Sequence, residues 1–340
     1  MAATTKQVVL VQWILDTRSW FPEATQTRHL ETQASRALAL LPENERAAVL
    51  KYYFVRDAKM SLASALLKHY AISRLAQIPW AATTITRDAR TKPVWRDPAT
   101  GSSPVAFNVS HQAGIVALVA VADYPGAVEV GVDVVCTSER RERDLAILRG
   151  QQGWHGFVDM HADVFAAGEA AYLKYQVIRE VPWLAAAARQ SPERAADGKL
   201  RAFYALWALR EAYVKLTGEA LLAEWLRELE FRYFHPPRPT AAWAVPAIEE
   251  TTKKKGEGEG EGDDAGDDDD APQVIRDIEI RFRGKRVDDV NICLRSVGPD
   301  YMICTAVRTP ENKADGLGWR LGPYETLSLD EVLGFAESMT

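Results

Sequence analysis

The sequence predicts an α+β fold built from two similar halves, and three observations lead to this class. Each half contains an apolar, strand-like run, then helical segments, then further strands. Residues 54–59 of the first half resemble residues 209–212 of the second, which indicates an ancient duplication. A turn signal with proline and glycine occupies residues 123–126. We therefore expect an N-terminal α+β half at residues 1–126 and a C-terminal α+β half at residues 127–340.

The first half begins with an apolar run at residues 8–15, which predicts a strand. Pro42 followed by acidic residues is typical of a helix start and leads into residues 47–53. Apolar residues spaced by three and four predict a second helix at about residues 56–70, with one face against a sheet. Residues 107–121 predict a strand, a turn and a second strand apolar enough to lie within the sheet.

The second half repeats this plan. A strand is expected at residues 129–135, followed by helical stretches at about 169–178 and 204–216. Runs rich in β-branched and aromatic residues then predict strands at 229–234, 277–282, 290–294 and 301–307.

An acidic insertion at about residues 246–272 interrupts the second half. Residues 249–270 contain eleven acids and three lysines, a net charge of −8, whereas the whole chain carries −6. The rest of the chain is therefore slightly basic, at +2, which suits binding of a polyanionic ligand. From Lys253 onward the insertion has no apolar residue that could anchor it to a core, and we expect it to be disordered, with a dedicated binding tail as the alternative.

Composition indicates a soluble enzyme. The 340 residues, 47% of them hydrophobic, are enough for a substantial core. Neither an uncharged apolar run of about 18 residues nor a basic flank leading into an apolar core is present, so we expect a cytoplasmic protein without membrane contact. Cys136, Cys293 and Cys304 lie in apolar runs without metal-like spacing, and we expect buried free thiols.

Two acidic residues and a lysine form the most informative pattern in the chain. Asp133 lies inside the apolar run Gly-Val-Asp-Val-Val, where a buried charge needs compensation. Trp207, Glu211 and Lys215 recur every four residues and therefore share one helical face. Two carboxylates beside a lysine suggest Mg²⁺ facing a phosphate, because Mg²⁺ is usually held by one or two carboxylates, waters and substrate phosphates.

Three blocks in this order resemble a known family. They are Phe-Asn-Val-Ser-His-Gln at 107–112, Gly-Val-Asp at 131–133 and Trp-x-x-Arg-Glu-x-x-x-Lys at 207–215. Together they resemble the 4′-phosphopantetheinyl transferases of the Sfp type, and most closely the eukaryotic, fungal members. The resemblance covers about residues 56–215. It implies a pseudo-dimer of two similar α/β halves with the active site in the cleft between them.

The resemblance also implies an activity. Such a holo-acyl-carrier-protein synthase moves the 4′-phosphopantetheine arm of coenzyme A to a serine of a carrier protein, depends on Mg²⁺ and releases adenosine 3′,5′-bisphosphate. Its partners would be acyl and peptidyl carrier domains of fatty acid, polyketide and nonribosomal peptide synthases, and an aminoadipate reductase of lysine biosynthesis. We expect a monomer. The sequence does not identify which of these carriers are served.

Within the resemblance, Asp133 and Glu211 are the expected magnesium ligands, and Glu211 is also a candidate general base. Lys215 is expected to contact the pyrophosphate; the alternative is an exposed intrahelical ion pair. Bacterial members often carry a second acid where this chain has Val135, so water or Glu169 is expected to complete the metal site. The alternative for Glu169 is an exposed acid in the first turn of a helix.

The remaining expected contacts bind coenzyme A. Ser110 and His111 match the family block that binds a phosphate of coenzyme A, more specifically its 3′-phosphate. Cations upstream match stretches that contact the 3′-phosphate and adenine, and arginine suits bidentate phosphate recognition. The predicted cofactor-binding residues are Arg56, Arg90, Lys92, Ser110, His111, Gln112 and Lys215.

Three other classes of protein agree less well with the sequence. A catalytically inactive module that binds coenzyme A or a carrier protein would have no reason to keep both Asp133 and Glu211. A magnesium-dependent nucleotidyl transferase or nuclease would not explain the Asn-Val-Ser-His block, and the nearly neutral body predicts no nucleic-acid partner. A hydrolase would need a base and an orienting acid around Ser110, which an adjacent His111 does not provide.

Overall fold

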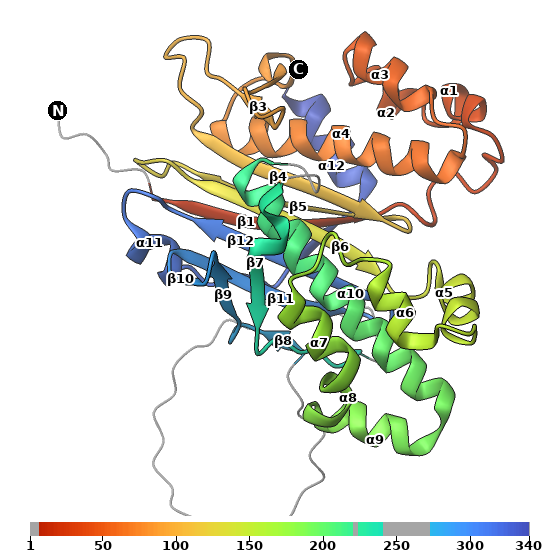
Figure 1. The fold of residues 1–340 in the computed structure, drawn as a ribbon. Coiled ribbons are helices and arrows are strands. Elements are labelled where there is room, and N and C mark those ends of the chain that lie inside the picture. The colour runs from red at the N-terminus through yellow and green to blue at the C-terminus, as the bar shows by residue number, and fades with distance from the viewer. Residues whose placement is uncertain (1–6, 220–223, 241–272, 340) are drawn as a thin grey trace, which may run out of the picture.

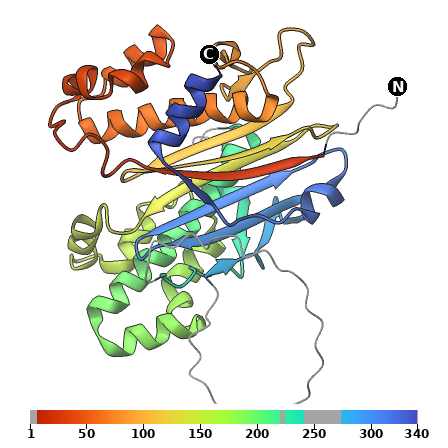
Figure 2. The same cartoon turned by 180° about the vertical axis from the view of Figure 1, so that it is seen from behind.

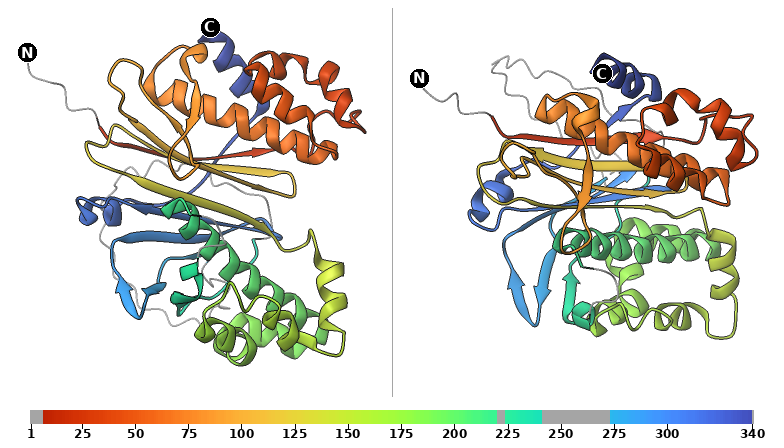
Figure 3. Two further views of the ribbon diagram at one scale, coloured as in Figure 1. Left: turned by 45° about the horizontal axis from the view of Figure 1, so that its top comes forward. Right: turned by 90° about the horizontal axis from the view of Figure 1, so that it is seen from above.

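Two four-stranded sheets lie face to face in the middle of the protein, and helices cover the outer face of each (Figures 1 and 2). The computed structural model describes residues 7–219, 224–240 and 273–339. Helices of the first half lie on one outer face and those of the second half on the other, as Figure 3 shows from two further directions. This two-half α+β architecture confirms the predicted fold class.

The first sheet has the strand order β13-β1-β5-β4. Strands β1 (Val9–Asp16), β5 (Ile115–Ala122) and β4 (Val105–Gln112) are antiparallel neighbours, and the long helix α4 (Val55–Ala76) packs on them. The other described elements of this half are 3-10 helices at Thr27–His29 and Trp80–Ala82, α1 (Leu30–Gln33), α2 (Ser35–Ala39), α3 (Glu43–Leu50), β2 (Ile85–Arg87) and β3 (Pro93–Trp95).

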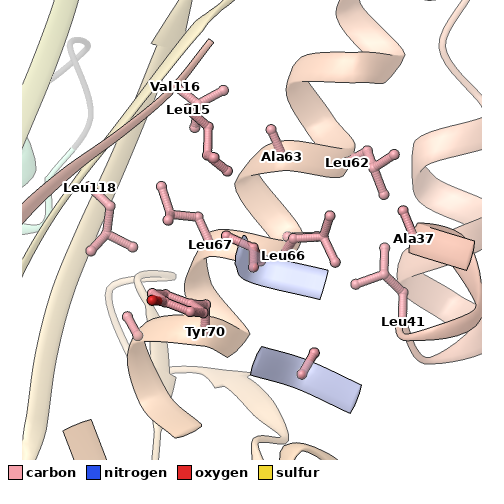
Figure 4. Packing of buried hydrophobic residues seen from close by; sticks show 14 of the residues in the cluster. Leu15, Ala37, Leu41, Leu62, Ala63, Leu66, Leu67, Tyr70, Val116 and Leu118 are labelled. Atoms are coloured by element: carbon pink, nitrogen blue, oxygen red, sulfur yellow. The ribbon is translucent and has the colours of Figure 1, made fainter. Parts of the chain in front are cut away.

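Helix α4 forms because its apolar residues recur on one face. Leu62, Leu66 and Tyr70 follow each other at intervals of four, and all three are buried. Figure 4 shows this face packed against side chains of β1 and β5, among them Leu15 and Leu118. The helix ends where Gln77 adopts a left-handed conformation.

The second sheet has the order β6-β12-β11-β8 and carries α10 on its outer face. Its strands are β6 (Glu129–Cys136), β12 (Tyr301–Arg308), β11 (Val290–Val297) and β8 (Val274–Ile275). The other described elements of this half are α5 (Arg141–Leu148), α6 (Gly153–Asp159), α7 (Ala167–Tyr175), α8 (Val177–Glu180), α9 (Pro182–Gln190), a 3-10 helix at Glu224–Glu228, β7 (Leu229–Arg232), β9 (Glu279–Phe282), β10 (Lys285–Val287) and α11 (Lys313–Gly318).

Helix α10 (Pro192–Thr217) is the helix that carries the Trp-Glu-Lys face. The side chain of Ser191 caps its start by accepting a hydrogen bond from the amide of Arg194, and Pro192 occupies the first turn. Gly218 ends it in a left-handed conformation. The helix has 26 residues and extends well before the predicted stretch 204–216, because its charged first turns give no apolar pattern that would predict a helix.

The C-terminal segment returns to the first half, contrary to the expected assignment of residues 127–340 to one half. Strand β13 (Glu325–Leu327) pairs in parallel with β1, and α12 (Leu329–Ser338) packs against α4. The rings of Phe335 and Tyr70 meet edge to face, with centroids 4.9 Å apart. The expected boundary at residue 126 falls in the connection between β5 and β6.

Three further expectations concern the chain as a whole. The acidic insertion at 246–272 lies outside the described residues. Cys136, Cys293 and Cys304 are buried free thiols, as predicted. Within the described ranges, none of the helices is long and apolar enough to cross a membrane.

Candidate active site

The site forms where β6 meets α10, and Gly131 makes the close approach possible. A Cβ atom at this position would overlap the carbonyl oxygen of Ala212 and lie 2.6 Å from the amide nitrogen of Leu216. Only glycine therefore lets the strand lie directly against the helix backbone. This contact explains the first residue of the Gly-Val-Asp block and brings Asp133, two residues further along β6, to the Glu211–Lys215 turn of α10.

Asp133, Ser110 and Lys215 form one hydrogen-bonded cluster. The Lys215 ammonium lies 2.6 Å from Oδ1 of Asp133 and 2.8 Å from Oγ of Ser110. The Ser110 hydroxyl donates to the same Asp133 oxygen at 2.9 Å. Asp133 is 5% exposed, and burial raises its pKa, although Lys215 and Ser110 stabilise the ionised form. The structure thus compensates the buried carboxylate with a cation from α10.

Glu211 lies one helical turn before Lys215 and shares this environment. Burial first, and the nearby charge of Asp133 second, raise the pKa of Glu211 to about 7, and the opposing effect of Lys215 is smaller. A carboxylate with a pKa near 7 can both give up and accept a proton at neutral pH. Two carboxylates held together in this way also leave a local excess of negative charge, which favours a cation.

A cavity of about 590 Å³ opens beside this cluster. Ser110, Asp133 and Lys215 line it, and so do His111 and Gln112 from the end of β4. Elements of both halves contribute, since Asp57 and Met60 come from α4 and Tyr204 and Trp207 come from α10. The cavity is large enough for a small-molecule ligand.

An aromatic wall on the second-half side of the cavity was not predicted. His161 lies edge to face on Phe203 at 4.6 Å, and Phe203 stacks on Trp207 at 6.1 Å. Burial lowers the pKa of His161, which favours its neutral form. The spacing of four that marks Trp207, Glu211 and Lys215 extends back to Phe203, so part of this wall was recognisable in the sequence. Arg140 and Arg143, which also line the cavity, carry no such signal.

Glu169 does not join this cluster, and the structure corrects its expected role as a metal ligand. Its carboxylate forms a buried ion pair with Arg210 at 2.6 Å and accepts hydrogen bonds from the amides of Ala166 and Phe231. Both oxygens are therefore used for structural bonds. Glu169 is 1% exposed, so the alternative of an exposed first-turn acid is also wrong. Arg210, where the family usually has lysine, faces inward to this pair rather than the cavity.

The residues on β4 that were predicted to contact coenzyme A point to opposite faces of the strand. Ser110 points to Asp133, whereas His111 faces the start of α4 and is influenced by the charge of Asp57. Partial desolvation lowers the pKa of His111, although the residue stays exposed at the end of β4, and the charge of Lys215 lowers it further. The Gln112 side chain accepts from the amide of Cys136 at 3.0 Å and donates to Glu139 at 2.7 Å.

The upstream cations lie farther out. Arg56, at the start of α4, is exposed and stacks over the ring of Phe54, 5.3 Å from its centroid. Arg90 and Lys92 instead close the C-terminal end of α10, where they donate to the carbonyls of Thr217 at 2.6 Å and Leu216 at 3.2 Å. They line a second cavity of about 560 Å³. Their expected contact with coenzyme A stays a prediction.

The residues present fit Mg²⁺ through two carboxylates rather than three. The described part of the chain contains no group of three or more His, Cys, Asp or Glu residues placed to hold a metal. Asp133 and Glu211 could nonetheless offer two carboxylates to a cation, and Mg²⁺ commonly keeps several waters. The donor set therefore suits a magnesium ion shared between protein, water and a substrate phosphate.

Comparison with known families agrees with this geometry. The family model described as "4′-phosphopantetheinyl transferase, N-terminal" matches residues 20–123, and the one for the "4′-phosphopantetheinyl transferase superfamily" matches residues 129–258. The chain belongs to the 4′-phosphopantetheinyl transferase family and is an enzyme of this class. This confirms the resemblance that the three sequence blocks indicated.

Individual relatives place it beside fungal members. It is 44% identical to "4′-phosphopantetheinyl transferase 1" of Fusarium mangiferae, over 99% of this chain and 98% of the relative. It is 32% identical to "4′-phosphopantetheinyl transferase NpgA" of Emericella nidulans, over 95% and 92%. The human "L-aminoadipate-semialdehyde dehydrogenase-phosphopantetheinyl transferase" is 25% identical over 65% of this chain and 60% of its own length.

Proposed function

We propose that this enzyme transfers the 4′-phosphopantetheine arm of coenzyme A to a serine hydroxyl of carrier-protein domains in a reaction that depends on Mg²⁺. The observation that carries the proposal is the contact between Lys215 and Asp133 at the wall of one cavity, with Glu211 one turn earlier on α10 and within electrostatic reach of both. Transfer of a phosphoryl group needs positioning and neutralisation of charge more than covalent chemistry from the protein. Two acids and an ammonium at one place meet this need.

In the proposed reaction, the serine oxygen attacks the phosphorus that carries the pantetheine arm. The bond from that phosphorus to the bridging oxygen breaks, and adenosine 3′,5′-bisphosphate leaves with the bond electrons. Glu211 accepts the serine proton, directly or through a water, because its pKa of about 7 suits a base at neutral pH. Lys215 then exchanges part of its contact with Asp133 for an oxygen of the pyrophosphate.

Asp133 and Glu211 would hold the magnesium ion. When bound, Mg²⁺ supplies electrostatic stabilisation to the phosphate oxygens. Asp133 is prepared for this role because Ser110 and the surrounding strand fix its carboxylate before any ligand arrives. Glu169 plays no part, since Arg210 and two amides occupy it.

Carrier domains of fatty acid, polyketide and nonribosomal peptide synthases are the proposed protein substrates, together with an aminoadipate reductase. The fungal relatives support transfer of phosphopantetheine in general. The names of the vertebrate relatives, which refer to L-aminoadipate-semialdehyde dehydrogenase, support the last of these carriers. Each of these carriers would have to present one serine hydroxyl to the cavity.

Mass spectrometry of intact carrier proteins tests the proposal. Each apo carrier is incubated with the enzyme, coenzyme A and either Mg²⁺ or a chelator. We expect the mass of one phosphopantetheine arm to be added in the presence of Mg²⁺ and little or none with the chelator. Binding of coenzyme A without this mass increase on any carrier would support an inactive binding module instead. Equal modification in the chelator would refute the dependence on Mg²⁺.

A further inference from the structure

The two halves meet along β4 and β6 through side chains instead of strand pairing. Each strand lies at the edge of its own sheet, and the two run in the same direction. Amides of β6 that face away from β12 have no backbone partner from β4. Alternate side chains of β4 accept their hydrogen bonds: Val132 donates to Asn108 at 2.9 Å, Val134 to Ser110 at 3.3 Å and Cys136 to Gln112 at 3.0 Å.

This ladder of Asn108, Ser110 and Gln112 solves a physical problem of the fold. Buried amides without acceptors are costly, yet direct pairing would draw the strands to about 4.8 Å and merge the sheets. Side-chain acceptors satisfy the amides while leaving room between the strands. The spacing of two follows from the alternation of side chains along a strand, so all three residues face β6. The next residue, His111, faces the other way, toward the start of α4.

The middle rung, Ser110, has no bonding capacity left for a substrate phosphate. Its oxygen accepts from Val134 and from Lys215, and its proton goes to Asp133. A hydroxyl group offers one donor and two acceptor sites, and all three are used. The outer rungs fix the amides one residue before Asp133 and three residues after it. Asp133 is thus held by its own hydroxyl partner and by the flanking backbone.

We propose that Asn108, Ser110 and Gln112 are positioning residues that set the register of β6 against β4 and aim Asp133 at the reacting phosphates. This inference rests on the proposed function. It differs from the role that family resemblance implies for Ser110 and Gln112, which is direct contact with coenzyme A. The two roles make different predictions for the 3′-phosphate.

Enzyme kinetics with coenzyme A and 3′-dephospho-coenzyme A distinguish them. For Ser110→Ala we expect kcat to fall on the order of 10- to 100-fold, as is typical when a group that orients a metal ligand is lost. The fall should be similar for both co-substrates, and Ser110→Thr, which keeps the hydroxyl, should restore most of the activity. A loss confined to coenzyme A would show that Ser110 anchors the 3′-phosphate and would overturn the proposal for this rung.

Hydrogen exchange tests the outer rungs without relying on activity. Asn108→Leu and Gln112→Leu remove the acceptors of Val132 and Cys136, so exchange across residues 129–136 should become faster in the full-length protein. Asn291→Leu is the matched control, because Asn291 lies on β11, which does not pair with β6, and donates to the carbonyls of Gly316 and Trp319 at the end of α11. Unchanged exchange in both ladder variants would refute the ladder. If the wild-type enzyme modified no carrier protein, the proposed function would be wrong. The hydrogen-exchange measurement would still show whether Asn108 and Gln112 hold β6.

Discussion

The ammonium of Lys215 lies 2.6 Å from the Asp133 carboxylate and joins the last turns of α10 to the middle of β6. Glu211, one turn earlier, adds a second carboxylate to this pair, so the three side chains together carry one excess negative charge when ionised. Burial is the main cause of the raised pKa of Glu211, and the charge of Asp133 adds to it. The excess negative charge explains why a divalent cation would be stabilising here, and why Lys215 would become available to a phosphate.

The raised pKa of Glu211 predicts how stability depends on pH. Between its ordinary value of 4.5 and about 7, the folded protein holds a proton that the unfolded chain has lost, so this group's contribution to stability falls as pH rises. Glu211→Gln mimics the protonated form. Without Mg²⁺ it should be more stable than wild type at pH 8, on the order of 2 kcal/mol, and equal to it near pH 4. Urea unfolding at both pH values measures this.

The matched control for that prediction is Glu142→Gln, because Glu142 is an exposed acid on α5. We expect its stability to follow that of the wild type at both pH values. A Glu211→Gln protein less stable than wild type at pH 8 would contradict the assignment of a destabilising charge to Glu211.

Gly131→Ala tests the contact that assembles the site. The added Cβ would overlap the backbone of α10 at Ala212, so the helix must move away from β6. We expect a loss of about 1–3 kcal/mol in unfolding free energy and a large loss of turnover. Gly334→Ala, on α12 with open space around the new Cβ, should be neutral or slightly stabilising. Equal behaviour of the two variants in thermal unfolding and turnover would show that the close approach is unimportant.

Glu169→Gln separates a structural role from a metal role. Breaking the buried pair leaves Arg210 without its carboxylate, which typically costs about 3–5 kcal/mol. We expect a strong fall in thermal stability. In the fraction of the variant that stays folded, the Mg²⁺ concentration that gives half-maximal activity should be close to that of the wild type. A selective rise in the Mg²⁺ requirement with normal stability would restore Glu169 as a ligand.

Arg56 and His111 stay candidates for the 3′-phosphate together with the more distant Arg90 and Lys92, whereas Ser110 is fully bonded, and the test addresses Arg56 and His111. Alanine at either position should weaken binding of coenzyme A much more than binding of 3′-dephospho-coenzyme A, as measured by calorimetry. Arg46→Ala, an exposed arginine on α3, serves as the control and should change neither affinity. Equal weakening for both ligands would place the two residues elsewhere in the site.

Sequence patterns predicted those features that depend on local order. The spacing of Trp207, Glu211 and Lys215 predicted one helical face, and the apolar surroundings of Asp133 predicted a buried carboxylate in need of a cation. Features that depend on distant partners were hidden. The ion pair between Glu169 and Arg210, which rules against a metal ligand, joins residues 41 positions apart and has no local signal. The return of β13 to pair with β1 likewise depends on segments at opposite ends of the chain.

The ladder on β4 shows the same limit within one motif. Asn108, Ser110 and Gln112 alternate in a way that places them on one strand face, which the sequence does reveal. What lies opposite that face is a strand of the other half, and no local pattern predicts it. Polar residues in a family block were therefore assigned to the substrate, although their described bonds are to the protein itself.

Turnover of Asp133→Asn and Glu211→Gln under Mg²⁺ titration tests the central claim most directly. With an apo carrier and coenzyme A, followed by intact mass, we predict that both variants fold but lose activity on the order of 10²-fold or more. High Mg²⁺ should partly recover Asp133→Asn, whose defect is in metal binding, whereas Glu211→Gln should stay impaired at saturation because it also lacks the base. Wild-type rates in both variants at subsaturating Mg²⁺ would contradict the proposed site.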